Sequence, residues 1–255
     1  MSGLYDHPIY YDIAFSFRDI SSEVDVFEAC IRRFSRIPVK SVLELGCGTA
    51  PHLEELSRRG YHYHGLDIKE VMLEYVKQKA RSIDAEIKLV NGNMIDFDLE
   101  TKVDFAFMLL GSLFVKDNSE LVDHFNSVAR VLKKGGLYLL DWCIEFDQLK
   151  LSAGGESWEI ERNGIHVKTT VSWKVVNPVN QTVEETIALD VDDHGVRQTL
   201  GQKDVRKLVY PQEFLYFISN NEHFEFVGWW NNWDLSQPLE AADKINRPIS
   251  LVRRV

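Results

Sequence analysis

A chain of 255 residues has room for one large domain, or for a core domain that carries an insertion. With 45% hydrophobic and 27% charged residues, the composition is that of a globular protein and excludes the disordered and fibrous classes. Acidic residues outnumber basic ones by 39 to 29, which gives a net charge of −10. Because nucleic acids and anionic membranes are negative too, this charge predicts that neither is a partner.

The sequence carries no sign of a membrane or secretory destination. No run of 18 apolar residues is present, and the first 20 residues contain acidic side chains and no apolar signal region. Cys30, Cys47 and Cys143 are far apart and form no CxxC pair, which argues against disulfides and against a zinc site. His62 and His64 share one face of a predicted strand but lack a third ligand. We therefore expect a cytoplasmic protein without a metal.

Helix and strand patterns alternate through the first 143 residues. Apolar residues spaced three and four apart predict helices over 22–37, 51–59, 71–80 and 117–132. Short apolar stretches predict strands over 41–45, 61–66, 87–90, 103–109 and 137–143. Asp117 and Glu120 fit a capping box that opens the fourth helix, and a glycine of 135–136 is expected to cap its end. This alternation predicts a parallel, doubly wound sheet covered by helices on both faces.

A different pattern begins after about residue 150. Strand-like alternation occupies 156–161, 165–176, 182–191 and 196–209, with turn sequences between these stretches. A helix over 211–221 and strands near 224–230 and 249–252 then return to the first pattern. We therefore predict an α/β fold: a mostly parallel, seven-stranded, Rossmann-like sheet with an antiparallel β insertion after the fifth strand. The predicted parts are an N-terminal cap helix with the core (1–143), the insertion (144–210) and the return to the core sheet (211–255).

Glycines and polar residues follow four of the predicted parallel strands, in the segments 44–49, 65–68, 91–94 and 110–112. Ligands of such sheets bind beyond the carboxyl ends of the strands. Gly46 and Gly48 allow the backbone to approach a ligand closely, and Asp67 is placed to accept hydrogen bonds from both hydroxyls of a ribose. These features predict a nucleoside site. Pro51 stands where a dinucleotide motif needs its third glycine, which weakens a nicotinamide interpretation.

The segment Val42–Thr49 (VLELGCGT), together with Gly65–Asp67 and Leu132–Gly136, resembles the class I S-adenosylmethionine-dependent methyltransferases, small-molecule type. The resemblance extends over residues 40–143 and implies S-adenosylmethionine as the cofactor. Many relatives have an aspartate at the position of Asn93, but the amide oxygen of asparagine can accept the same hydrogen bond without a charge.

The resemblance also implies a role for each segment at the strand ends. Gly46 and Gly48 would lie near the methionine part of the cofactor, Asp67 would bind its ribose, and the segments 68–72 and 93–94 would surround its adenine. Leu110–Ser112 would line the passage between cofactor and acceptor. The complete set of implied cofactor-binding residues is Glu44, Gly46, Cys47, Gly48, Asp67, Ile68, Met72, Asn93, Met94, Leu110, Gly111 and Ser112.

Aromatic residues are frequent in the N-terminal segment 5–17, before the first long helix. In similar enzymes such a segment folds over the active site, and aromatic faces favour a sulfonium cation, so Tyr5 and Tyr11 are candidates near the reacting atoms. The alternative is that these rings are ordinary core. No catalytic base follows from the sequence; His7, His166 and Glu145 are candidates that could equally be surface residues.

The predicted function is methyl transfer from S-adenosylmethionine to a nitrogen, oxygen or carbon atom of a small molecule, by in-line displacement. The insertion, 144–210, is the expected cover of the acceptor, because specificity in this fold lies in added segments. A protein acceptor remains open, as do a module that binds the cofactor without transferring methyl groups and a nicotinamide-linked dehydrogenase. The oligomeric state cannot be predicted.

Overall fold

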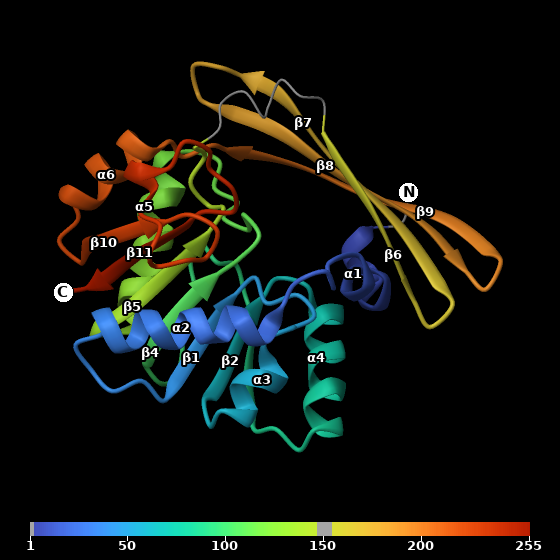
Figure 1. The fold of residues 1–255 in the computed structure, drawn as a ribbon, viewed down its shortest axis with the longest axis horizontal. Helices are drawn as coiled ribbons and strands as arrows, with labels where there is room; N and C mark the ends of the chain where they lie inside the picture. The colour runs from blue at the N-terminus through green and yellow to red at the C-terminus, as the bar shows by residue number, and fades with distance from the viewer. Residues whose placement is uncertain (1–2, 147–154) are drawn as a thin grey trace.

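The computed structural model describes residues 3–146 and 155–255, which form two sheets and their covering helices (Figure 1). Residues 147–154 of the expected insertion lie outside the described residues. The helices are η1 (Leu4–Asp6), α1 (Pro8–Ala14), α2 (Ile20–Phe34), α3 (Leu53–Arg58), α4 (Glu70–Ser82), α5 (Asn118–Val131), α6 (Pro211–Ser219) and η3 (Leu239–Ala241).

The larger sheet has seven strands in the order β10-β11-β5-β4-β1-β2-β3. Its strands are β1 (Ser41–Leu45), β2 (His62–Asp67), β3 (Ile87–Asn91), β4 (Val103–Met108), β5 (Leu132–Asp141), β10 (Phe224–Trp230) and β11 (Ile249–Arg254). Strands β1 to β5 are parallel, whereas β11 runs antiparallel to β5 and β10 antiparallel to β11. The predicted mostly parallel, seven-stranded fold is confirmed.

Helices cover both faces of this sheet, which explains why its central strands are almost entirely buried. All six residues of β4 are buried. On one face α2, α3 and α4 bury residues such as Phe27, Leu53 and Val76. On the other face α5 and α6 bury residues such as Phe125 and Phe214 (Figure 1).

The expectation that a glycine caps the end of α5 is wrong. Helix α5 ends at Val131, and Leu132 is already extended (φ −87°, ψ 130°) as the first residue of β5. Gly135 does have a positive φ of 87°, but it lies within β5. The Lys133 ammonium donates to the carboxylate of Asp104 in β4 at 2.6 Å. Pairing with the neighbouring strand therefore starts before the glycines, a tertiary effect that a local helix-end pattern does not contain.

The predicted cap at the start of α5 is confirmed. The carboxylate of Asp117 accepts hydrogen bonds from the backbone of Ser119 at 2.9 Å and of Glu120 at 3.0 Å. In return the carboxylate of Glu120 accepts from the backbone of Lys116, one residue before the cap.

The smaller sheet is the predicted antiparallel insertion after β5. It consists of β6 (Glu156–Arg162), β7 (Ile165–Asn177), β8 (Thr182–Asp193) and β9 (Val196–Lys207), paired in sequence order. The N-terminal elements η1 and α1 bury their apolar side chains against β7, β8 and β9. The indole of Trp158 in β6 donates to the carbonyl of Ala14, and the hydroxyl of Tyr10 donates to Asp193 at 2.8 Å. Figure 1 shows α1 lying under this sheet, beside the end of α4.

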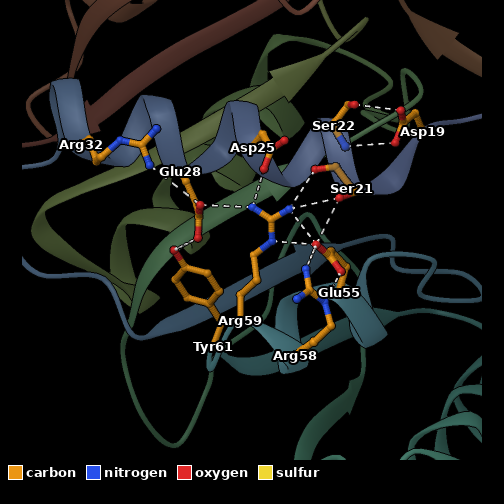
Figure 2. Close-up of polar contacts among 10 residues, drawn as sticks. All are labelled: Asp19, Ser21, Ser22, Asp25, Glu28, Arg32, Glu55, Arg58, Arg59 and Tyr61. Atoms are coloured by element: carbon orange, nitrogen blue, oxygen red, sulfur yellow. Dashed lines mark hydrogen bonds and ion pairs between the residues drawn. The ribbon is translucent and has the colours of Figure 1, made fainter.

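A polar network joins α2 to α3 and so fixes the helix that follows the glycine turn (Figure 2). The guanidinium of Arg59 donates to Asp25 and Glu28 of α2 at 2.6 and 3.1 Å, and to Glu55 of α3 at 2.7 Å. The hydroxyl of Tyr61 also donates to Glu28. Because several carboxylates share one guanidinium, this arrangement is more rigid than an isolated surface ion pair.

Candidate functional site

A cavity of about 210 Å³ lies at the carboxyl ends of β1 and β4, where an open parallel sheet binds ligands. Its walls come from α1, from the turn after β1, from the loop after β4, and from single side chains of α4 and β6. Six of the residues predicted for the site line it, namely Tyr11, Glu44, Gly46, Cys47, Leu110 and Ser112.

The glycine turn after β1 has the conformation that its sequence predicts. Gly46 and Gly48 have positive φ angles of 65° and 51°, which residues with a side chain rarely adopt. A Cβ atom on Gly46 would lie 3.6 Å from the side chains of Met94 and Ser112, and one on Gly48 would lie 3.4 Å from the ring of Tyr11. Side chains from three other segments therefore converge on this turn.

Asp67 ends β2 beside the glycine turn. One carboxylate oxygen accepts from the backbone N–H of Gly48 and the other from that of Lys69, both at 2.8 Å. Each oxygen keeps a second lone pair, so the group can still accept two hydrogen bonds, as a ribose diol would require. Burial raises the pKa of Asp67 above its usual value, although the backbone hydrogen bonds oppose this shift.

The residues expected around an adenine lie in different environments. Ile68 is 64% exposed beside Asp67, and Asn93 is exposed, with its side-chain oxygen accepting from the backbone of Ile95. Met94 is half-buried next to Gly46. Met72, in contrast, is only 1% exposed, so it offers almost no surface to a ligand.

Tyr5 and Tyr11 lie side by side, with ring centroids 5.7 Å apart, and Tyr11 packs on Phe15 at 4.7 Å. Burial raises the pKa of the Tyr11 hydroxyl to about 12 and that of Tyr5 well above its usual value. Both phenols are therefore protonated at neutral pH, and neither serves as a base. Tyr11 presents its ring to the glycine turn, and the ring of Tyr5 lies beside that of Tyr11.

The loop after β4 is held by Asp141, at the end of β5. The backbone N–H of Leu110 donates to the Asp141 carboxylate at 3.1 Å, and that of Gly111 donates to the Asp141 carbonyl at 2.9 Å. Both residues have positive φ angles, 54° and 67°. The Ser112 hydroxyl donates to the carbonyl of Leu109, so the loop is fixed before any ligand binds.

Sequence reasoning missed a buried polar network beneath the turn. The carboxylate of Glu44 accepts from the hydroxyl of Tyr63 at 2.5 Å and lies 3.3 Å from His52. The other ring nitrogen of His52 lies 2.7 Å from Glu23, whose second oxygen accepts from Arg247 at 2.6 Å. Glu44 is thus directed into the protein, where it positions the turn. These residues come from four distant segments, so no local signal predicts their contact.

Three cationic residues that the sequence did not single out also line the cavity. Arg162 of β6 donates to Asp12 of α1 at 2.6 Å, and the Lys79 ammonium donates to the carbonyl of Ala50 at 2.9 Å. Burial lowers the pKa of Lys79. The third is Arg18, which lies between α1 and α2.

Two carboxylates lie side by side on one face of the insertion sheet. Glu185 of β8 pairs in register with Asp204 of β9. The guanidinium of Arg206 donates to Glu185 at 3.0 Å and to the carbonyl of Gly111 at 3.2 Å, so it joins the sheet to the loop after β4. Burial raises the pKa of Tyr5, and the charges of both carboxylates contribute to the rise, which indicates that they lie near this ring.

The other candidates lie outside the cavity wall. His166 is partly exposed and lies 3.2 Å from Glu159, His7 stacks on Tyr10, and Glu145 bonds through its backbone to Val209. The parts of the chain that the structure describes contain no group of three side chains suited to a metal ion. They also contain no helix of sufficient length and apolar character to cross a membrane.

Comparison with known families gives a direct match. Residues 42–136 match the family model described as a methyltransferase domain. The predicted resemblance to class I S-adenosylmethionine-dependent methyltransferases is confirmed. The match contains the glycine turn, Asp67 and the loop after β4, whereas the N-terminal segment and the insertion lie outside it.

A curated relative from Streptomyces venezuelae, dTDP-3-amino-3,4,6-trideoxy-alpha-D-glucopyranose N,N-dimethyltransferase, is 29% identical over 140 residues, which are 53% of this chain and 56% of that protein. This chain spans about half the length of the curated relatives it matches, from 41% to 56%.

Solved structures resemble the whole chain. An S-adenosylmethionine-dependent methyltransferase from Clostridium acetobutylicum has a TM-score of 0.76 at 18% identity, over 96% of each chain. The sugar N-methyltransferase KedS8 from Streptoalloteichus has a TM-score of 0.73 at 19% identity, over 100% of this chain and 94% of that one. At this identity the similarity establishes a shared fold, insertion included.

Proposed function

We propose that this protein transfers the methyl group of S-adenosylmethionine to a small-molecule acceptor. The observation that carries the proposal is the juxtaposition of the Gly46–Gly48 turn with the Asp67 carboxylate, which keeps two acceptor positions free. This arrangement fits an adenosyl cofactor: the turn provides close approach and the carboxylate provides acceptors for the ribose diol. When bound, S-adenosylmethionine supplies a methyl group already activated by a sulfonium.

The protein's own residues would hold the reactants in line and exclude water. Tyr11 covers the turn with its ring, Tyr5 packs beside it, and aromatic faces stabilise a neighbouring cation. The loop 110–112, fixed by Asp141, would form the passage to the acceptor. Such positioning accounts for much of the barrier reduction in a displacement that needs no covalent help from the enzyme.

We infer that the acceptor atom is the nitrogen of an amine. An alcohol or an acidic carbon would profit from a general base, but both tyrosines stay protonated and the candidate bases lie outside the cavity wall. A neutral amine attacks with its own lone pair, and the carboxylates of Asp204 and Glu185 would suit the positive charge that the nitrogen acquires on methylation. The names of the dimethyltransferase relative and of KedS8 point in the same direction.

We also propose that the insertion, 144–210, covers the acceptor, that nucleic acid is not the substrate, and that the protein acts in the cytoplasm. The three buried cysteines are unpaired, which supports a reducing compartment. The cofactor-binding module without transfer remains the second candidate. A nicotinamide-linked dehydrogenase is disfavoured by Pro51 and by the methyltransferase match over 42–136.

The test is an assay with methyl-labelled S-adenosylmethionine and a panel of small primary and secondary amines, matched alcohols, peptides and RNA. We expect label in an amine product, with stoichiometric S-adenosylhomocysteine. Replacement Asp204→Asn should raise KM for the amine and leave the cofactor affinity unchanged. Cofactor binding without product from any acceptor would favour the second candidate, and transfer to alcohols alone would refute the amine.

A further inference from the structure

Glu185 of β8 is a largely buried carboxylate that keeps one oxygen open. Its side chain is 11% exposed. Oε2 accepts hydrogen bonds from the indole of Trp173 at 2.8 Å and from the guanidinium of Arg206 at 3.0 Å. Oε1 accepts no hydrogen bond from the residues that the structure describes, and it is not sealed from solvent. The carboxylate is therefore fixed through one oxygen and has the other available for a ligand.

The fixed carboxylate lies near the loop after β4 and the N-terminal tyrosines. The guanidinium of Arg206 that donates to Glu185 also donates to the carbonyl of Gly111 at 3.2 Å, so a single side chain joins the carboxylate to this loop. Burial is the main cause of the raised pKa of Tyr5 and of Tyr11, and the charge of Glu185 adds to the rise in both. Glu185 is therefore close to the groups that surround the candidate site.

Asp204 of β9 supplies a second open oxygen on the same face of the insertion sheet. It is the cross-strand partner of Glu185, and such partners have Cβ atoms about 4.5–5.5 Å apart. Oδ1 of Asp204 accepts from the side-chain amide of Gln202 at 3.1 Å, whereas Oδ2 accepts no hydrogen bond within the described part of the chain. One small polar group can thus contact both carboxylates. Since ionised carboxylates only accept hydrogen bonds, that group must be a donor.

We propose that the open oxygen of Glu185 accepts a hydrogen bond from the acceptor nitrogen, and that the enzyme therefore methylates primary and secondary amines but not tertiary amines. The proposal rests on the proposed function and adds a limit to the number of methyl groups. In each transfer the lone pair of the neutral amine forms a bond to the methyl carbon while the carbon–sulfur bond breaks. The electrons of that bond pass to sulfur, which gives S-adenosylhomocysteine. The positive charge passes to nitrogen, and the ammonium product loses a proton to water.

The number of N–H groups on the neutral amine sets the limit. A primary amine has two of them and a secondary amine has one, so either can donate to Glu185 while its lone pair is directed at the methyl group. A neutral tertiary amine has none. It leaves the Glu185 oxygen without a donor, and nothing then orients its lone pair. Methylation should stop at the tertiary amine.

Mass spectrometry of the products tests this limit on the full chain with methyl-labelled S-adenosylmethionine. The probes are cyclohexylamine, N-methylcyclohexylamine and N,N-dimethylcyclohexylamine, together with the same three forms of the panel amine that takes up the most label. We expect the primary form to gain one and then two methyl groups. A quaternary ammonium product from a tertiary form would overturn the proposal.

Glu185→Gln tests the residue itself. Because Trp173 and Arg206 both donate to the position of Oε2, the amide oxygen should occupy it and the amide NH2 should replace Oε1. An acceptor thus becomes a donor of the same size. We expect kcat/KM for the primary amine to fall by about 10- to 150-fold. Calorimetry on the complex with S-adenosylhomocysteine should show a similar loss of amine affinity, while the affinity for S-adenosylhomocysteine itself stays within about threefold.

The matched control is Glu184→Gln, one residue earlier on β8. Its side chain points to the opposite face of the strand, where the ammonium of Lys203 donates to it at 3.4 Å. This variant should stay within about twofold of the wild type in kcat/KM and in amine affinity. Equal losses in the two variants, or unchanged values in Glu185→Gln, would overturn the proposal. If Glu185→Gln does not fold, the product series of the wild type still decides. If the wild type methylates no amine of the panel, the amine acceptor of the proposed function itself fails.

Discussion

Replacing Asp67 by asparagine separates its part in binding from its part in folding. The two carboxylate oxygens accept from the backbone of Gly48 and Lys69. An amide accepts at one end only, so the variant loses one bond, worth about 1 kcal/mol. Because burial raises the pKa of Asp67, the charged form is disfavoured in the fold, and removing the charge offsets part of this loss. We expect the free energy of unfolding to change by less than about 1 kcal/mol.

The affinity for the cofactor should change far more. Losing a charge-assisted acceptor for the ribose hydroxyls costs about 1.5–3 kcal/mol, which is about 10- to 150-fold in Kd. Titration calorimetry with S-adenosylhomocysteine measures the affinity, and urea unfolding measures the stability. If Asp67→Asn binds S-adenosylhomocysteine within about twofold of the wild type, the ribose assignment is wrong.

The same variant carries a pH signature. As the pH falls, the raised pKa makes Asp67 take up a proton at a higher pH than an exposed aspartate does. The wild-type affinity should therefore weaken on acidification, starting above the usual aspartate range. Asp67→Asn should lack this dependence, and an equal slope in both proteins would contradict the assignment.

Three further predictions concern the neighbouring groups. Tyr11→Phe keeps the ring over Gly48 and should bind the cofactor within about threefold of the wild type, whereas Tyr11→Ala should lose about tenfold, both measured by calorimetry. Gly48→Ala forces a side chain into a backbone with φ of 51° and should cost about 1–2 kcal/mol in urea unfolding; an unchanged stability would refute this strain. Burial alone would raise the pKa of Glu23, but His52 and nearby arginines lower it from 4.5 to about 2. The ionised carboxylate contributes its full stabilisation above pH 4.5, and this contribution is lost as the pH falls toward 2. Between these pH values the free energy of unfolding of the wild type should therefore fall by about 3 kcal/mol more than that of Glu23→Gln. Equal losses in the two proteins would contradict the prediction.

The glycine turn and Asp67 could be predicted from sequence because their signals are local. A short apolar strand, two glycines and an acidic residue at the end of the next strand lie within 30 residues, and parallel pairing brings the strand ends together. Met72 stays a prediction: helical periodicity places it one turn after Ile68, and the same periodicity gives it the buried position that it occupies.

The remainder depends on contacts that no window of sequence contains. His52 joins Glu23 to Glu44, and Arg247 reaches the same network from near the C-terminus. Histidine and arginine are frequent on surfaces, so their types alone give no reason to expect burial. The prediction for the end of α5 was wrong for a related reason. Strand pairing with β4 begins at Leu132, before the glycines that a local pattern takes as the end of the helix.

The residues of the site that could be predicted from sequence lie within the matched segment, and those that could not lie mostly outside it. This division has a functional meaning. The matched segment, 42–136, contains the glycine turn, Asp67 and Ser112, which we propose to face the cofactor. Tyr11 and Arg18 precede this segment, and Asp204 follows it by almost 70 residues. Curated relatives align over about half of their length, which is the result expected if that segment serves one cofactor and the segments around it adapt to different acceptors. Helix α1 is hydrogen-bonded to β6 of the insertion and also forms part of the cavity wall. A change in the insertion sheet that suits a new acceptor should therefore also move α1 and with it the residues that line the cavity. Substitutions of Trp158 or Arg162, the β6 residues that bond to α1, should therefore alter cofactor affinity as well as acceptor choice.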